Sequence, residues 1–185
     1  MGGRIARTAA IMFIIVTLAG CGFRPLYGRN AGDPTINAAL SAIYVQPLPD
    51  REGQLVHNAL LVRFNRNGDA EPARFRLAVT VVSAETPTVL QSDQTASRAI
   101  VTFVATFKLY EENTSLTAGS FTRTFSYDYV PEQYSNVSAR ADVAKRAAEE
   151  IADEIRDRIS TYFARAAKAR AAAASAPAPA NPNQQ

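Results

Sequence analysis

The sequence is poor in the residues that build most catalytic and metal centres: it has one cysteine, one histidine and no tryptophan. A single cysteine excludes an internal disulfide framework and a cysteine-based zinc site. His57 has no partner at metal-ligand spacing and falls beside the apolar stripe of a predicted helix, so we expect a packed or surface histidine. Nucleophile-elbow, phosphate-loop and His-Glu-x-x-His motifs are also missing. We therefore predict no enzyme activity, no cofactor and no metal.

Long hydrophobic runs are missing too, apart from one at residues 9–19. This run is about half of the roughly 20 residues that a membrane-spanning helix needs. Arg4 and Arg7 precede it, and it ends in Leu-Ala-Gly-Cys at residues 18–21. The arrangement is typical of a bacterial lipoprotein signal peptide over residues 1–20. We expect cleavage before Cys21, which would then carry a diacylglycerol and an N-acyl chain; the alternative is a transmembrane helix with a buried cysteine.

Neither sign of charge is in excess once the signal is removed. The whole sequence has 20 basic and 17 acidic residues, for a formal net charge of +3. Two arginines leave with the signal, so the mature chain keeps 18 basic and 17 acidic residues, a net charge of +1. This balance argues against nucleic acid as a partner. The remaining length suits one domain with a hydrophobic core, tethered to a membrane through its lipid.

Residues 21–38 are expected to form a lipidated tether. Three large apolar side chains, Phe23, Leu26 and Tyr27, stand within five residues of one another, and Pro25 favours an extended backbone before it. Two interpretations stay open: these side chains fold back onto the domain, or they serve docking or sorting. Residues 29–38 contain Gly, Asp-Pro and Asn and are predicted to be a loop.

Residues 39–167 are predicted to form one α+β domain. Period-two alternation indicates strands, and apolar residues at three- and four-residue spacing indicate helices. The expected strands are residues 41–47, 74–84, 97–111 and 116–129, and the expected helices are residues 51–65 and 136 or 138 to 167. The order β-α-β-β-β-α favours a two-layer sandwich, in which two helices pack on one face of a four-stranded, mostly antiparallel sheet.

The connections follow from turn and capping residues. Asp50 is expected to cap the first helix with its carboxylate. A hairpin turn is expected at residues 111–114, a polar loop at residues 85–96, and a disordered Ala/Pro-rich tail at residues 168–185.

One face of the expected sheet is rich in threonine and also carries Arg76 and Lys108. It is either an ordinary solvated sheet face or a contact surface for a partner or an anionic amphiphile. Arg98, Lys108 and Arg123 are candidate contacts for phosphate groups, because guanidinium and ammonium groups form charge-assisted hydrogen bonds to such oxygens. Arg123 falls in the apolar row of its strand, so it lies at the sheet edge or packs its stem there.

The tract at residues 18–28, Leu-Ala-Gly-Cys-Gly-Phe-Arg-Pro-Leu-Tyr-Gly, resembles the start of the LptE family of lipopolysaccharide-assembly lipoproteins. Residue by residue, the resemblance makes Cys21 the acylated residue and makes Phe23, Pro25, Leu26 and Tyr27 the post-anchor segment. It implies an outer-membrane lipoprotein on the periplasmic side. Such a protein plugs the β-barrel LptD, helps the barrel assemble and binds lipopolysaccharide for insertion into the outer leaflet. Gly22 after the cysteine, in place of Asp, fits release to the outer membrane.

Three functional hypotheses follow. The first is an LptE-like binding and assembly subunit, whose polar sheet face would meet the wall of a barrel lumen. The second is a periplasm-facing accessory lipoprotein of another lipid-transport or outer-membrane assembly system. The third is a tethered enzyme. Recovery of a large barrel protein in mild detergent distinguishes the first from the second.

Overall fold

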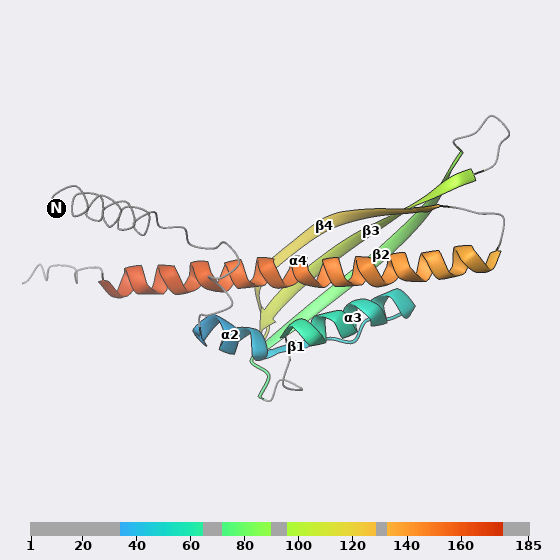
Figure 1. Ribbon diagram of the computed structural model, residues 1–185. Helices are drawn as coiled ribbons and strands as arrows, with labels where there is room; N and C mark the ends of the chain where they lie inside the picture. The colour runs from blue at the N-terminus through green and yellow to red at the C-terminus, as the bar shows by residue number, and fades with distance from the viewer. Residues whose placement is uncertain (1–33, 65–71, 90–95, 129–132, 176–185) are drawn as a thin grey trace, which may run out of the picture. The chain divides into compact units, whose positions relative to one another are not determined.

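The computed structural model describes residues 34–64, 72–89, 96–128 and 133–175 (Figure 1). These ranges hold three helices and four strands. In chain order they are α2 (Pro34–Ser41), β1 (Ile43–Val45), α3 (Arg51–Phe64), β2 (Phe75–Val89), β3 (Ala96–Glu111), β4 (Thr114–Asp128) and α4 (Gln133–Ser175).

The four strands form one mixed sheet in the order β1-β2-β3-β4. β1 runs parallel to β2, as a connection through the crossover helix α3 allows, and places Ile43 opposite Phe75. β2, β3 and β4 are antiparallel, with Leu77 opposite Leu109 and Ala105 opposite Phe121. The prediction of an α+β fold with a four-stranded, mostly antiparallel sheet is confirmed.

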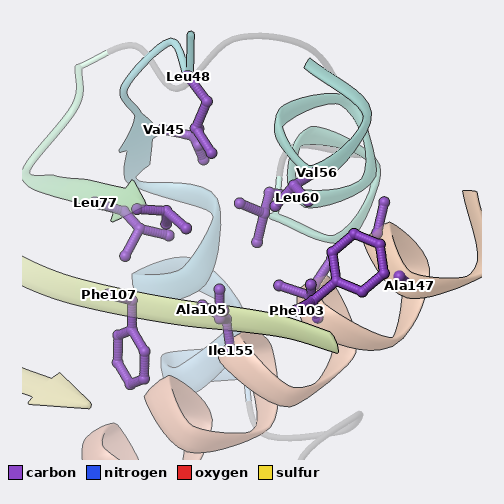
Figure 2. Close-up of a cluster of buried hydrophobic side chains, with 14 of the residues drawn as sticks. Val45, Leu48, Val56, Leu60, Leu77, Phe103, Ala105, Phe107, Ala147 and Ile155 are labelled. Atoms are coloured by element: carbon purple, nitrogen blue, oxygen red, sulfur yellow. The ribbon is translucent and has the colours of Figure 1, made fainter. Parts of the chain in front are cut away.

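The hydrophobic core lies between one face of this sheet and the helices. Odd-numbered residues of β2 and β3 point into it, and α3 and α4 pack against each other over them. Figure 2 shows side chains of the two layers meeting, for example Leu77 and Phe107 from the sheet with Leu60 and Ile155 from the helices. Each such side chain stabilises the fold by roughly 1.5–3 kcal/mol through removal of apolar surface from water.

Several predicted boundaries were wrong. Residues 34–38, expected in a loop, belong to α2, because Ile36 and Leu40 lie one turn apart and are both buried. The first strand is only Ile43–Val45 rather than residues 41–47. α4 begins at Gln133 and continues to Ser175, so residues 168–175 of the expected tail are helical, as their alanines favour. Residues 176–185 lie outside the described residues.

The expected loop at residues 85–96 was also placed too early, because β2 continues through Pro87 to Val89. β1 pairs only with Phe75–Leu77, so β2 is an edge strand at Pro87, where a residue without an N–H is tolerated.

The expected hairpin turn is present, but the expected helix cap is not. The hairpin turn between β3 and β4 is confirmed, with Glu112 at a φ of 52°. Asp50 has a φ of 64°, whereas an N-cap residue normally has an extended backbone. Its carbonyl oxygen accepts from the Gln54 N–H at 3.0 Å, but within the described ranges no hydrogen bond joins its carboxylate to the helix. The prediction of a carboxylate cap was therefore wrong.

Ion pairs connect α4 to its neighbours. Arg63 of α3 binds Asp153 through two hydrogen bonds, 2.5 and 2.7 Å long, which raise the pKa of Arg63 above its usual value. Farther along, Glu85 of β2 accepts from the Tyr127 hydroxyl at 2.6 Å and pairs with Arg140 of α4 at 3.1 Å. These contacts hold α4 along one face of the sheet.

Candidate interaction surfaces

The face of the sheet that points away from α3 and α4 carries side chains in regular rows. We call it the open sheet face. It consists of side chains that alternate with the core row, and cross-strand register aligns them in rows. Its main residues are Arg76, Ala78, Thr80 and Val82 of β2; Arg98, Thr102, Val104, Thr106 and Lys108 of β3; and Ala118, Ser120, Thr122, Thr124 and Ser126 of β4.

Short hydroxyl side chains dominate the open sheet face. Thr106 donates to the Ser120 hydroxyl at 3.2 Å, and Ser120 donates in turn to the Ala105 carbonyl at 3.2 Å. Val82 and Val104 are cross-strand partners and are 61% and 41% exposed, so a small apolar patch lies at the centre of this polar surface. The predicted threonine-rich face is confirmed, but the sequence reading missed the valine pair. The sequence does contain this information, because Val82 and Val104 both fall at positions that alternate with the apolar core residues of their strands.

Arg98 and Lys108 lie on the open sheet face but not together. They are ten residues apart on β3, which corresponds to roughly 33 Å along a strand. Arg98 forms an ion pair with Asp128 at 3.2 Å near one end of the sheet. Lys108 is exposed near the other end, and no described residue forms an ion pair with it. A single phosphate cannot bridge the two.

Arg123 lies on the opposite side of the sheet, facing α4. Its guanidinium binds Glu154 at 2.5 Å and lies 3.9 Å from Glu150, and it sits 5.3 Å from the centre of the Phe121 ring. Arg123 was expected either at the sheet edge or with its stem packed on the apolar row. Both descriptions apply, because β4 is an edge strand and Arg123 lies against Phe121 of that row. Glu154 also accepts from Arg158 at 2.6 Å, and this hydrogen bond, helped by the charges of both arginines, lowers the pKa of Glu154.

A groove, which we call the α2 groove, lies between α2 and the C-terminal half of α4. Figure 1 shows these two helices near each other. It has a volume of about 360 Å³, and its walls are mainly apolar. The main lining residues are Ile36 and Ala39 of α2, Phe75 of β2, Leu116 of β4, and Phe163 and Ala166 of α4. The sequence reading missed it because α2 itself was expected to be a loop.

No group of three or more His, Cys, Asp or Glu residues in the described ranges could hold a metal ion. His57 is half-buried in α3, and no described residue forms a hydrogen bond with its Nδ1 atom. Of the helices in these ranges, none combines the length and apolar character that crossing a bilayer requires. Cys21, Phe23, Pro25, Leu26 and Tyr27 lie outside the described residues.

The fold can be compared with solved structures. A candidate lipoprotein from Caulobacter crescentus aligns with a TM-score of 0.59 at 22% identity, over 73% of this chain and 98% of that chain. The minor lipoprotein of Acinetobacter baumannii aligns with a TM-score of 0.48 at 16% identity, over 65% and 92% of the two chains. The first likeness shows a common fold. A comparison with curated protein sequences gave no match.

The fold and its surfaces define the class of protein: an α+β domain with helices on one face of a mixed sheet and an open, hydroxyl-rich opposite face. The family comparison makes this specific. The family model LptE, described as lipopolysaccharide-assembly, matches residues 40–159, which is more than half of the chain. The chain belongs to the LptE family.

Proposed function

We propose that this chain is a lipopolysaccharide-assembly lipoprotein of the outer membrane, anchored on the periplasmic side through acylated Cys21. In this role it forms a complex with the β-barrel LptD, plugs the barrel, aids its assembly and binds lipopolysaccharide. It acts by binding and not by catalysis. The match of residues 40–159 to the LptE family is the observation that carries the proposal.

The open sheet face is the surface that we assign to the barrel wall. A barrel lumen is polar, and hydroxyl side chains can donate and accept hydrogen bonds there without burying a charge. β3 has 16 residues, so three strands of this length present roughly 700 Å², close to the ~800 Å² that each partner contributes to a standard interface. The exposed Val82 and Val104 side chains supply an apolar centre for such a contact.

Among the predicted phosphate contacts, the geometry favours Lys108. Its ammonium group is exposed and has no carboxylate partner among the described residues, so a phosphate would not have to displace one. Arg98 would have to give up or share Asp128, and Arg123 would have to give up Glu154. We therefore expect Lys108→Glu to weaken the binding of lipid A more than Arg123→Glu does.

Co-purification from mild detergent tests the complex. The full lipoprotein is extracted from outer membranes, and LptD should be recovered with it. Val104→Asp on the open sheet face should reduce the recovery strongly, because an aspartate would be desolvated at the interface. Val62→Asp on α3 is the matched control, since Val62 is also an exposed valine but lies on the helical layer. Recovery of a different barrel would support an accessory role in another assembly system and would reject the proposal.

The anchor is tested separately. Cells fed a clickable fatty acid should label the wild-type chain and fail to label Cys21→Ala. Continued labelling of that variant would reject Cys21 as the acylated residue.

A further inference from the structure

The α2 groove combines apolar walls with a cationic mouth. Ala39 of α2 and Ala166 of α4 lie on its two helical sides, and their short side chains leave the space open. The rings of Phe75 and Phe163 pack together with their centres 5.1 Å apart and form another wall. The volume of about 360 Å³ is near the lower end of the roughly 300–1,000 Å³ typical of ligand pockets. The groove therefore suits one slender apolar group and not several.

Contacts within the fold hold the groove in this shape. α2 is anchored by burial of Ile36 and Leu40. Just after this helix, the Ala42 carbonyl accepts from the N–H groups of Arg74 and Phe75 at 3.0 and 3.1 Å. Because these contacts are present without a ligand, an apolar group can enter with little reorganisation of the walls, which favours binding.

The charges around the groove indicate the kind of ligand. Arg74 and Arg170 line it together with one carboxylate, that of Glu111. Arg74 and Glu111 form an ion pair 2.7 Å long. Arg170 is exposed, and no described residue forms an ion pair with it. Residues 158–175 of α4 contain arginine and lysine but no Asp or Glu, so the mouth of the groove complements an anionic group.

We propose that the α2 groove binds a single-chain anionic phospholipid, with its acyl chain against Phe75 and Phe163 and its phosphate at Arg170. A guanidinium group forms charge-assisted, bidentate hydrogen bonds to phosphate oxygens. The apolar walls and the acyl chain are removed from water together. Since the groove has room for one chain, a second chain of a larger lipid would stay in water, and such lipids should bind less well.

The helical walls of this site lie outside the part of the chain that matches the LptE family. The α4 wall, within residues 162–170, follows the end of the match at residue 159, and the α2 wall, within residues 35–39, precedes its start at residue 40. The inference goes beyond the proposed function, because it involves neither LptD nor lipopolysaccharide.

Photoaffinity labelling of the full lipoprotein tests the inference. The protein is reconstituted into phosphatidylcholine vesicles, and lysophosphatidylglycerol with a diazirine at the end of its acyl chain is added and irradiated. A lysophospholipid exchanges through water, so it reaches the groove wherever the domain lies relative to the bilayer. Peptide mass spectrometry should locate the label within residues 34–42 and 162–170. The same probe with a choline headgroup, which has no net charge, should label these peptides about threefold less.

Two pairs of variants assign the label to the groove. Ala166→Phe fills the space and should reduce labelling to background, whereas Ala171→Phe, at an exposed position of the same helix outside the groove, should leave it unchanged. Arg170→Glu should reduce labelling about threefold or more. Lys145→Glu makes the same change of charge at an exposed position of α4 away from the groove and should have no effect.

Circular dichroism shows whether each variant is folded, and Ala39→Leu on the opposite wall replaces Ala166→Phe if that variant unfolds. Full labelling of a folded groove-filling variant would overturn the inference. Equal labelling by the two headgroups, together with full labelling of Arg170→Glu, would also overturn it. Unlabelled lysophosphatidylglycerol should displace the probe, and displacement at lower concentrations of lipid A would reject a single-chain ligand.

Discussion

Gly119 provides the most discriminating test of the packing between β4 and the rest of the sheet. It lies on the inward face of β4, opposite Phe107 of β3. A Cβ atom added at Gly119 would lie 2.8 Å from Cε1 and 3.0 Å from Cζ of Phe107, and 3.3 Å from Nη1 of Arg158. Phe107 is only 2% exposed, so its ring has little room to move away.

Two opposing effects set the magnitude for Gly119→Ala. Alanine restricts the unfolded chain and favours the strand by roughly 0.5–1 kcal/mol over glycine. The clash with a buried ring costs about 1–3 kcal/mol, as in other overpacked cores. The clash wins, and the expected net loss is about 1 kcal/mol, equivalent to a fall in Tm of roughly 2–4 °C for a domain of this size.

Urea denaturation of the mature protein, followed by circular dichroism, measures this loss, and a double-mutant cycle identifies its cause. In a Phe107→Leu background the ring atoms near Gly119 are gone. There Gly119→Ala should be neutral or stabilising by about 0.5 kcal/mol. If Gly119→Ala stabilises the otherwise wild-type protein, or costs the same in both backgrounds, the contact described between Gly119 and Phe107 does not limit the packing.

Three further predictions concern the core, the ion pairs and the charged open face. Ile155→Ala should lower the free energy of unfolding, measured by urea denaturation, by about 2–5 kcal/mol because Ile155 is fully buried. Val137→Ala, at a position 60% exposed on the same helix, should lower it hardly at all, and similar losses would contradict the assigned face of α4. Glu154 has a lowered pKa in the folded state, so its contribution to stability is present above the ordinary value of 4.5 and is lost as pH falls through the folded pKa. Glu154→Gln should therefore destabilise the protein by about 0.5–1 kcal/mol at pH 7, and the difference should shrink as the pH falls below 4.5 and through the lowered pKa of the folded state; a pH-independent difference would refute the ion-pair explanation. Lys108→Glu should weaken lipid A binding several-fold at low salt, and the difference from wild type should shrink as salt rises; equal affinities at low salt would remove Lys108 from the contact.

Most of the sheet and both long helices could be predicted from the sequence because their apolar rows are regular. The alternation through Phe103, Ala105 and Phe107 assigns one face to the core, and that face is buried. α2 could not be predicted in the same way. It has only eight residues, its stability comes from burial of Ile36 and Leu40, and the Gly- and Asp-Pro-containing segment before it favours a loop.

For the candidate surfaces, too, local patterns could be predicted and long-range contacts could not. The threonine-rich face and the position of Lys108 on it follow from strand alternation alone. The pairing of Arg123 with Glu154 joins residues 31 positions apart and depends on how α4 crosses β4, which no local pattern encodes. The α2 groove depends on the contact of α2 with a helix more than a hundred residues later, and it appears only when both are placed.

Site-specific photo-crosslinking in cells tests the central claim most directly. A photoreactive amino acid is placed at Thr106, in the middle of the open sheet face, and in a second strain at Val62 on α3. The account predicts a covalent adduct with LptD from the Thr106 position, identified by mass spectrometry. Adducts with LptD from the Val62 position alone, or an adduct with another barrel protein in its place, would contradict it.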